Sequence, residues 1–273
     1  MKTRKLHFQS PFHFLISLFS WTPRYRLVND TGALHFWGVY FSAAYAQFID
    51  YIFKLTERSI TMAQRTVHYL FGEMISKEIT LSDKKRFLLG CILPDAIEPA
   101  CRTASHFKVE TNTRKYFDFE AFRNQFFDLI LRDDLYLGYY LHLVEDAFYR
   151  AFFYTDRFTM PRSREEVPIL HKDYHILNSY IVKKYDIHNI LGSSFSLKSE
   201  PLCDIATFLV DEFLRELACD FTEQTKGYTV FLTESMLDEY ITIYIPLAIE
   251  EVNSIKSGSS SLYATDYAWP AKR

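Results

Sequence analysis

The sharpest chemical signal in the sequence is a pair of residues one helical turn apart, His142 and Asp146. A spacing of four residues places both side chains on one face of a helix. An imidazole nitrogen and a carboxylate oxygen are ordinary ligands of zinc, at about 2.0–2.2 Å from the ion. The surrounding stretch, residues 136–149, is apolar nearly all round, which is typical of a buried helix. Because a buried His and Asp must be hydrogen-bonded, paired or metal-bound, the pattern predicts a metal site or a buried polar pair.

A second pair of candidate ligands, Asp95 and His106, follows a predicted helix end. Pro94 stops the helix that runs through residues 87–89, so Asp95 falls at the start of a loop. Its carboxylate can then face a cleft, and His106 follows a short loop later. In the alternative interpretation Asp95 caps a helix and His106 is an incidental loop residue.

Three further residues are candidate ligands with weaker patterns. His68 lies on the apolar side of a helix expected over residues 64–77, where a lone histidine is more often a core residue than a ligand. His171 and Asp173 lie two residues apart and therefore point to different sides of a predicted helix. That segment is compatible with metal binding, but its pattern does not require it. Glu145 is interpreted as part of a solvated face.

These residues must be positioned by helices. Apolar residues recurring at i, i+3 and i+4 predict an all-α fold, a single multi-helix domain with long loops. Gly (8) and Pro (9) are scarce, which also favours long helices over turn-rich β structure. The expected helices cover residues 64–77, a segment through 87–89 that stops before 94, 117–131, 135–154, 169–185, 202–221 and 233–256.

The composition of the chain changes near Met62. Residues 1–61 are crowded with Phe, Tyr and Trp and show little helical or strand period, whereas Met62 looks like the natural opening of a domain. We expect translation to start at Met62, with residues 1–61 an artefact of start assignment. The alternative is a genuine extension that faces lipid or a partner. The helical metal-binding domain is expected over residues 62–256, and the polar, Ser-rich tail 257–273 is predicted to be disordered.

Charge and hydropathy exclude several classes of protein. The formal net charge of −3 shows no excess of Lys and Arg, so nucleic acid is not favoured as a partner. The four cysteines form no C-x-x-C pair, which excludes zinc ribbons and thioredoxin-like motifs. Free thiols are the favoured interpretation, with a disulfide as the alternative. No segment has the ~18 uninterrupted apolar residues of a membrane-spanning helix. We expect a cytoplasmic protein, with peripheral membrane contact as the alternative; the pattern leaves the oligomeric state open.

Taken in order, these pieces resemble the zinc-dependent phospholipase C family, which is related to the S1/P1-type nucleases, and in particular its small bacterial members of uncertain substrate. The resemblance covers about residues 62–190. The matching features are a His on the first helix (His68), a Gly-x-x-x-Pro-Asp segment (Asp95), a Ser-His-Phe (His106) and a Tyr-Leu-Gly-Tyr-x-x-His-x-x-x-Asp (His142 and Asp146).

The resemblance implies an all-α fold of phospholipase C/P1 nuclease type with one to three zinc ions in a cleft between helices. Asp95, His106, His142 and Asp146 would surround one zinc, and His68 would lie close to a second ion that shares Asp146. The implied reaction is phosphoester hydrolysis of a phosphodiester or a phospholipid head group. Zinc lowers the pKa of a coordinated water to about 7, and Asp95, as ligand or base, would orient that water.

The sequence departs from the secreted phospholipases after Asp146. It lacks the His and His-x-x-x-Glu set that completes their zinc cluster, and it lacks their mature N-terminal Trp ligand. His171 and Asp173 are the candidate replacements. Two functions follow as alternatives: a zinc-dependent phosphoester hydrolase, or a non-catalytic helical module that retains a structural metal and binds a partner.

Overall fold

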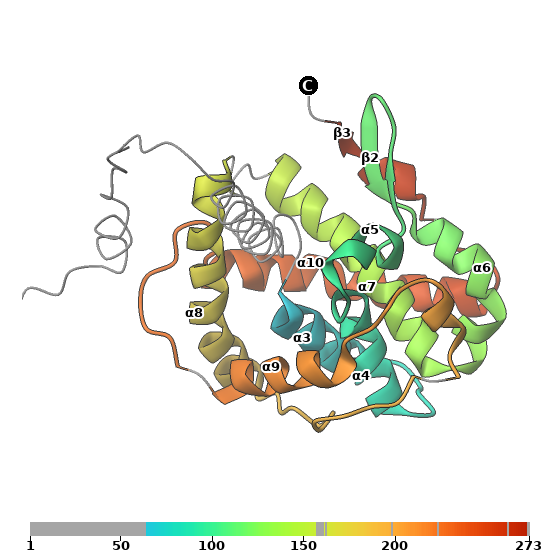
Figure 1. The fold of residues 1–273 in the computed structure, drawn as a ribbon, viewed down its shortest axis with the longest axis horizontal. Helices are drawn as coiled ribbons and strands as arrows, with labels where there is room; N and C mark the ends of the chain where they lie inside the picture. The colour runs from blue at the N-terminus through green and yellow to red at the C-terminus, as the bar shows by residue number, and fades with distance from the viewer. Residues whose placement is uncertain are drawn as a thin grey trace, which may run out of the picture. The chain divides into compact units, whose positions relative to one another are not determined.

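A computed structural model describes residues 64–156, 161, 163–197, 199–222, 224–260 and 262–271, and this part of the chain is mostly helical (Figure 1). The predicted predominantly helical architecture is therefore confirmed. The proposed start at Met62 and the extension 1–61 lie outside the described residues. The α-helices are α3 Arg65–Ile75, α4 Lys84–Ile92, α5 Arg102–Ser105, α6 Phe119–Arg132, α7 Asp134–Arg150, α8 Val167–Tyr185, α9 Val210–Thr222 and α10 Glu234–Lys256. Short helical turns are η2 Leu93–Asp95, η3 Pro99–Cys101, η4 Ala151–Asp156, η5 Arg164–Glu166, η6 Pro201–Asp204 and η7 Ala264–Tyr267.

Side-chain caps fix where four of the helices begin. Asp83, Asp118, Asp133 and Thr233 each accept a hydrogen bond from a backbone N–H in the first turn of α4, α6, α7 and α10, respectively. Such caps satisfy N–H groups that have no partner within the helix. The predicted stop before Pro94 is confirmed, because α4 ends at Ile92 and passes into the η2 turn.

Helices α4 and α7 cross with their backbones in direct contact, and two glycines allow it. A Cβ atom on Gly90 would lie 2.1 Å from the carbonyl oxygen of Leu135, and one on Gly138 would lie 2.2 Å from that of Phe87. Any side chain at either position would push the helices apart. The close crossing places the η2 turn, which follows α4, against α7.

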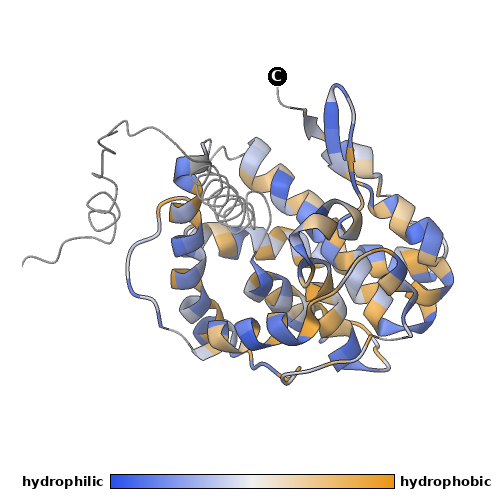
Figure 2. Cartoon of the chain, in the orientation of Figure 1, coloured by the Kyte–Doolittle hydropathy of each residue, from blue (hydrophilic) through white to orange (hydrophobic). Residues whose placement is uncertain are grey.

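Helix α7 lies at the centre of the helical packing and is buried on almost every side, as its apolar sequence predicted. From α10, Tyr240 and Tyr244 donate hydrogen bonds to the backbone carbonyls of Glu145 (3.3 Å) and Leu141 (3.1 Å). Figure 2 shows hydrophobic residues gathered where the helices meet, while α8 and α9 also carry hydrophilic residues. Beyond Arg150 the helix widens into the π-helical η4 turn, so the helix predicted over 135–154 ends in a different geometry.

A small antiparallel sheet, which the sequence analysis did not anticipate, corrects the prediction of a disordered tail. Its strands β1 Lys108–Glu110, β2 Arg114–Phe117 and β3 Trp269–Pro270 lie in the order β1-β2-β3. Within the tail, Trp269 packs on Phe117 with ring centres 5.0 Å apart, and the N–H of Ala271 donates to the carbonyl of Thr113 at 2.9 Å. The described residues of the tail are ordered by partners far away in the sequence, which the tail's polar composition does not reveal.

The helix predicted over residues 202–221 is shorter in the structure. The η6 turn ends at Asp204, and α9 begins only at Val210. Between them the backbone runs alongside the segment after η2: Leu209 N–H donates to the carbonyl of Ala96 at 2.7 Å, and Glu98 N–H donates to that of Thr207 at 3.1 Å. These backbone bonds replace a helical turn.

None of the helices among the described residues is long and apolar enough to cross a membrane. All four cysteines are unpaired. Cys91 is buried, whereas Cys203 and Cys219 are exposed.

Candidate metal centre

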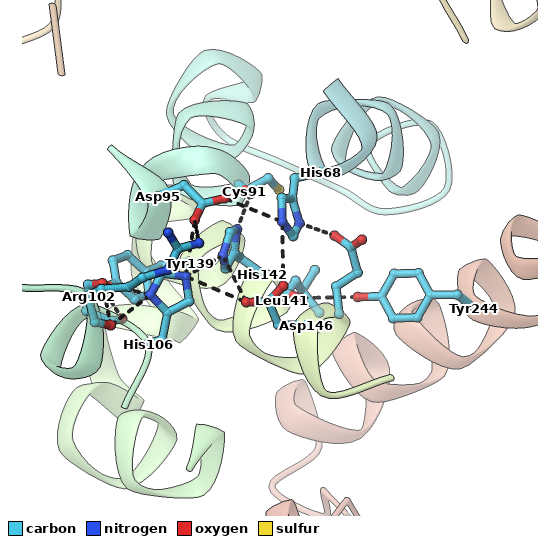
Figure 3. Close-up of polar contacts among 12 residues, drawn as sticks. His68, Cys91, Asp95, Arg102, His106, Tyr139, Leu141, His142, Asp146 and Tyr244 are labelled. Atoms are coloured by element: carbon cyan, nitrogen blue, oxygen red, sulfur yellow. Dashed lines mark hydrogen bonds and ion pairs between the residues drawn. The ribbon is translucent and has the colours of Figure 1, made fainter. Parts of the chain in front are cut away.

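Five of the predicted ligands come together where α3, α4 and α7 meet (Figure 3). His68 comes from α3, Asp95 from the η2 turn, His106 from the residue after α5, and His142 and Asp146 from α7. We call these five residues the His-Asp cluster. All are buried except Asp95, whose side chain is 14% exposed.

The ligand atoms of the cluster are spaced as around a small cation. His106 Nε2 lies 3.4 Å from His142 Nε2, 3.4 Å from Asp95 Oδ1 and 3.6 Å from Asp146 Oδ2. His142 Nε2 lies 3.6 Å from Asp146 Oδ2, and His68 Nε2 lies 3.7 Å from both Asp95 Oδ2 and Asp146 Oδ1. A tetrahedral zinc ion with bonds of 2.0–2.1 Å separates its ligand atoms by about 3.4 Å. The spacing therefore fits such an ion.

Two overlapping groups of three can each hold a metal ion. His106, His142 and Asp146 form one group, and His68, Asp95 and His142 form the other; within each group the ligand atoms lie within 4.8 Å of one another. Both groups use His142, which can bind only one ion through its Nε2 atom, so the cluster accommodates one ion with a crowded set of ligands or two ions that share a carboxylate such as Asp146. With two ions, five ligand residues leave coordination positions open.

Two of the histidines are held in the form that binds metals. His106 Nδ1 donates to the backbone carbonyl of Arg102 at 3.0 Å, and His142 Nδ1 donates to that of Cys91 at 2.8 Å. A carbonyl can only accept, so Nδ1 carries the hydrogen and Nε2 keeps a lone pair directed into the cluster. Tyr139 on α7 donates to the carbonyl of Ser105 at 2.6 Å, which fixes the segment that carries His106.

The third histidine is held by a residue that the sequence analysis assigned to a solvated face. His68 Nδ1 forms a short hydrogen bond with the carboxylate of Glu145, and Glu145 is buried. Metal-binding histidines commonly donate their second nitrogen to such a carboxylate. The signal that could have identified Glu145 is the apolar character of α7 on all sides, because it leaves no solvated face for a carboxylate.

The cluster contains buried polar atoms that the described part of the chain does not satisfy. Both carboxylate oxygens of Asp146, His68 Nε2 and Glu145 Oε1 have no hydrogen-bond partner there. Asp95, Glu145 and Asp146 bring three carboxyl groups together in little-exposed space, which is costly without compensating positive charge. A divalent cation would satisfy His68 Nε2 and the oxygens of Asp146 and would supply that charge.

In the metal-free protein, protons and charges are distributed unevenly over the cluster. Burial by itself lowers the pKa of His68, but the carboxylates of Glu145, Asp146 and Asp95 outweigh it and raise that pKa to about 9. Burial lowers the pKa values of His106 and His142, so both stay neutral. A proton on His68 therefore supplies the positive charge that a metal ion would otherwise bring.

The two aspartates of the cluster are shifted in opposite directions. Burial raises the pKa of Asp146 well above its usual range. Burial also acts to raise the pKa of Asp95, but the contacts with His106, His142 and Arg102 hold it below its usual range. An ionised Asp95 of low basicity is better suited to bind a cation than to accept a proton.

The structure does not bring His171 or Asp173 into the cluster. Both lie on α8, and neither belongs to the two groups of ligand atoms found among the described residues. The buried carboxylate of Asp173 instead accepts hydrogen bonds from the backbone N–H groups of three consecutive residues ahead of α10, Val230, Phe231 and Leu232, at 2.6–3.1 Å. His171 is partly exposed and packs near the ring of Tyr174.

In comparisons with known proteins, no protein family, curated protein or solved structure matches the chain. The geometry of the cluster is therefore the basis for a functional proposal. A buried set of imidazole nitrogens and carboxylate oxygens suits zinc better than calcium or magnesium, which prefer oxygen ligands alone.

Proposed function

We propose that the chain is a zinc-dependent phosphoester hydrolase whose metal is held by the His-Asp cluster. The observation that supports this most directly is the set of three histidine Nε2 atoms and the unsatisfied carboxylate of Asp146 in one buried space. In this proposal His106, His142, Asp146 and Asp95 hold one ion. His68 lies toward a second ion that shares Asp146, as in the resemblance to the phospholipase C family.

The proposed chemistry divides between the ion and the chain. When bound, the ion supplies Lewis acidity that activates water and polarises a phosphoryl oxygen. Asp95 is the one cluster residue with an exposed part, so it faces the side from which water and substrate arrive. Its ionised carboxylate can accept a hydrogen bond from a water and orient it. Glu145 fixes the ring of His68, and the Arg102 and Cys91 carbonyls fix the other two rings.

One observation favours the alternative, a non-catalytic helical module with a structural metal. His68, His106, His142 and Asp146 are almost completely buried, and structural zinc sites are closed by protein ligands. A single ion bound by four or five of these residues would keep no position for substrate. The number of ions bound and the activity of the loaded protein separate the two functions.

The deciding experiment measures the metal content of the purified full-length chain by mass spectrometry, before and after addition of zinc. We expect about one to two zinc ions per chain, lost in His142→Ala and in Asp146→Asn. The matched control is His188→Ala, because the His188 side chain is 78% exposed and outside the cluster. A folded wild-type chain that takes up no added zinc would end the proposal.

Activity is then tested on the zinc-loaded chain with bis(p-nitrophenyl) phosphate and with phosphatidylcholine vesicles. Hydrolysis that disappears in His142→Ala supports the hydrolase, and cleavage of the vesicle lipid specifies a phospholipase. Zinc binding without hydrolysis of either substrate would favour the structural module.

A further inference from the structure

Arg150 lies one helical turn beyond Asp146 on α7, and aromatic rings hold its guanidinium. Its Cζ atom lies 4.1 Å from the ring centre of Trp269 and 4.7 Å from that of Tyr154. The Nε and Nη1 atoms are buried and have no hydrogen-bond partner among the described residues. The rings satisfy the faces of the cation but not its N–H groups, which lie in the plane of the guanidinium. Leaving those donors unpaired is costly unless a ligand accepts from them.

A second arginine, Arg102, contacts the cluster directly. Arg102 Nη2 is 3.6 Å from Asp95 Oδ1, and Figure 3 shows Arg102 beside Asp95 and His106. Burial lowers the pKa of Arg150 to about 10, which leaves it charged at neutral pH.

The charge of the cluster explains why these cations matter. Asp95 and Asp146 together neutralise one divalent ion, and Glu145 adds a third carboxyl group. A single bound metal therefore leaves the centre with little net attraction for an anionic substrate. Positive charge for that purpose must come from side chains around the centre.

We propose that Arg150 and Arg102 form an anion subsite beside the His-Asp cluster, which binds the non-bridging oxygens of a phosphate group. The inference rests on the proposed function and names the part of the substrate that is recognised. The planar fork of a guanidinium matches two phosphate oxygens, which favours arginine over lysine for this role. The Trp269 and Tyr154 rings fix that plane before the ligand arrives.

The test is calorimetric titration of the full-length chain with inorganic phosphate, in zinc-loaded and metal-free form. Arg150→Met and Arg102→Met remove one charge each, and Arg150→Lys keeps the charge but loses the fork. The control is Arg132→Met, at the exposed end of α6. We expect Arg150→Met to weaken phosphate binding about 10- to 100-fold, the range for hydrogen bonds to charged groups. Arg150→Lys should lose part of the affinity, the control none, and zinc content should stay equal in all.

Two results would overturn the anion subsite. One is a wild-type chain that binds no phosphate in either form; the other is wild-type affinity in both Arg150→Lys and Arg102→Met, the variants that disturb packing least. A failure of the proposed function looks different. In that case the chain takes up no zinc, yet phosphate binding still depends on Arg150, and the subsite stands without the metal.

Discussion

Two buried carboxylates, Glu145 and Asp173, occupy opposite kinds of environment. Glu145 forms a hydrogen bond with His68 and has one oxygen atom without a partner among the described residues. Asp173 accepts from the backbone of three consecutive residues, and both of its oxygens are satisfied. The first carboxylate is poised to support a cation, whereas the second already has a complete set of donors.

Glu145→Gln is expected to weaken zinc binding about 10- to 100-fold, the usual effect of losing the carboxylate behind a metal-binding histidine. The glutamine retains the shape but not the charge that orients His68 and increases its basicity. Competition with a chromophoric zinc chelator measures the affinity. Glu250→Gln, at an exposed position of α10, is the control. An unchanged affinity in Glu145→Gln would show that Glu145 does not act through His68.

Asp173→Asn is expected to destabilise the protein by about 1–3 kcal/mol without changing its zinc content. The amide has one acceptor oxygen where the carboxylate has two, and it carries no charge to strengthen the bonds from residues 230–232. Urea unfolding gives the free energy, and mass spectrometry gives the zinc content. Loss of zinc in a folded Asp173→Asn chain would instead support the prediction that Asp173 is a metal ligand.

The candidate site could be predicted from the sequence where its signals are local. His142 and Asp146 share a helical face because of their spacing, and Pro94 predicts the end of the helix before Asp95. Glu145 and Arg150 could not be assigned in the same way. Their partners, His68 and Trp269, belong to distant segments, so only the packing of α3 and of the tail against α7 gives them a role.

Among the secondary-structure elements, the crossing of α4 and α7 has the greatest influence on the centre. Gly138→Ala places a methyl group 2.2 Å from the carbonyl oxygen of Phe87, where backbone rather than a flexible side chain must move. We expect a loss of about 1–3 kcal/mol or more and weaker zinc binding, because Asp95 shifts relative to His142. Chemical unfolding and zinc titration measure the two effects.

The control for this change is Glu250→Ala, an exposed helical position where substitution costs within about 0.5 kcal/mol. Wild-type stability and zinc affinity in Gly138→Ala would mean that the two helices can separate without disturbing the centre.

The elements themselves were predictable to the extent that they depend on local periodicity. The observed bounds of α3, α6, α8 and α10 lie within a few residues of the predicted helix ranges. Strand β3 and η7 were missed because two strand residues and one turn carry no periodic signal. They form through contacts with β2 and with Phe117, which no window of the sequence contains.

For the whole molecule, the charge balance of the cluster predicts how stability depends on pH. The pKa of His68 is about 9 in the metal-free folded chain against 6.5 for the ordinary group, so the folded state binds more protons between these values. The stability that this shift gives the metal-free protein is fully present below pH 6.5 and is expected to be lost as the pH rises toward 9. The raised pKa values of Glu145 and Asp146 act in the same direction.

Urea unfolding at several pH values between 6.5 and 9, with and without zinc, measures this dependence. Zinc takes the place of the proton on His68, so the loaded protein should lose less stability over the same range and bind zinc more tightly at higher pH. His68→Gln should flatten the metal-free curve. A metal-free protein whose stability rises steadily from pH 6.5 to 9 would contradict the assigned protonation of His68.

Strand β3 also implies an order of events in time. The His-Asp cluster uses residues between His68 and Asp146, whereas Trp269 joins β2 from the far end of the described chain. Contacts between residues far apart in the sequence form late in folding, because closing the long loop between them costs conformational entropy. A chain emerging from the ribosome can thus gather its metal ligands before the indole ring reaches Arg150. The metal site would therefore form when α7 packs against α3 and α4. The anion subsite would form later, when the tail packs against α7.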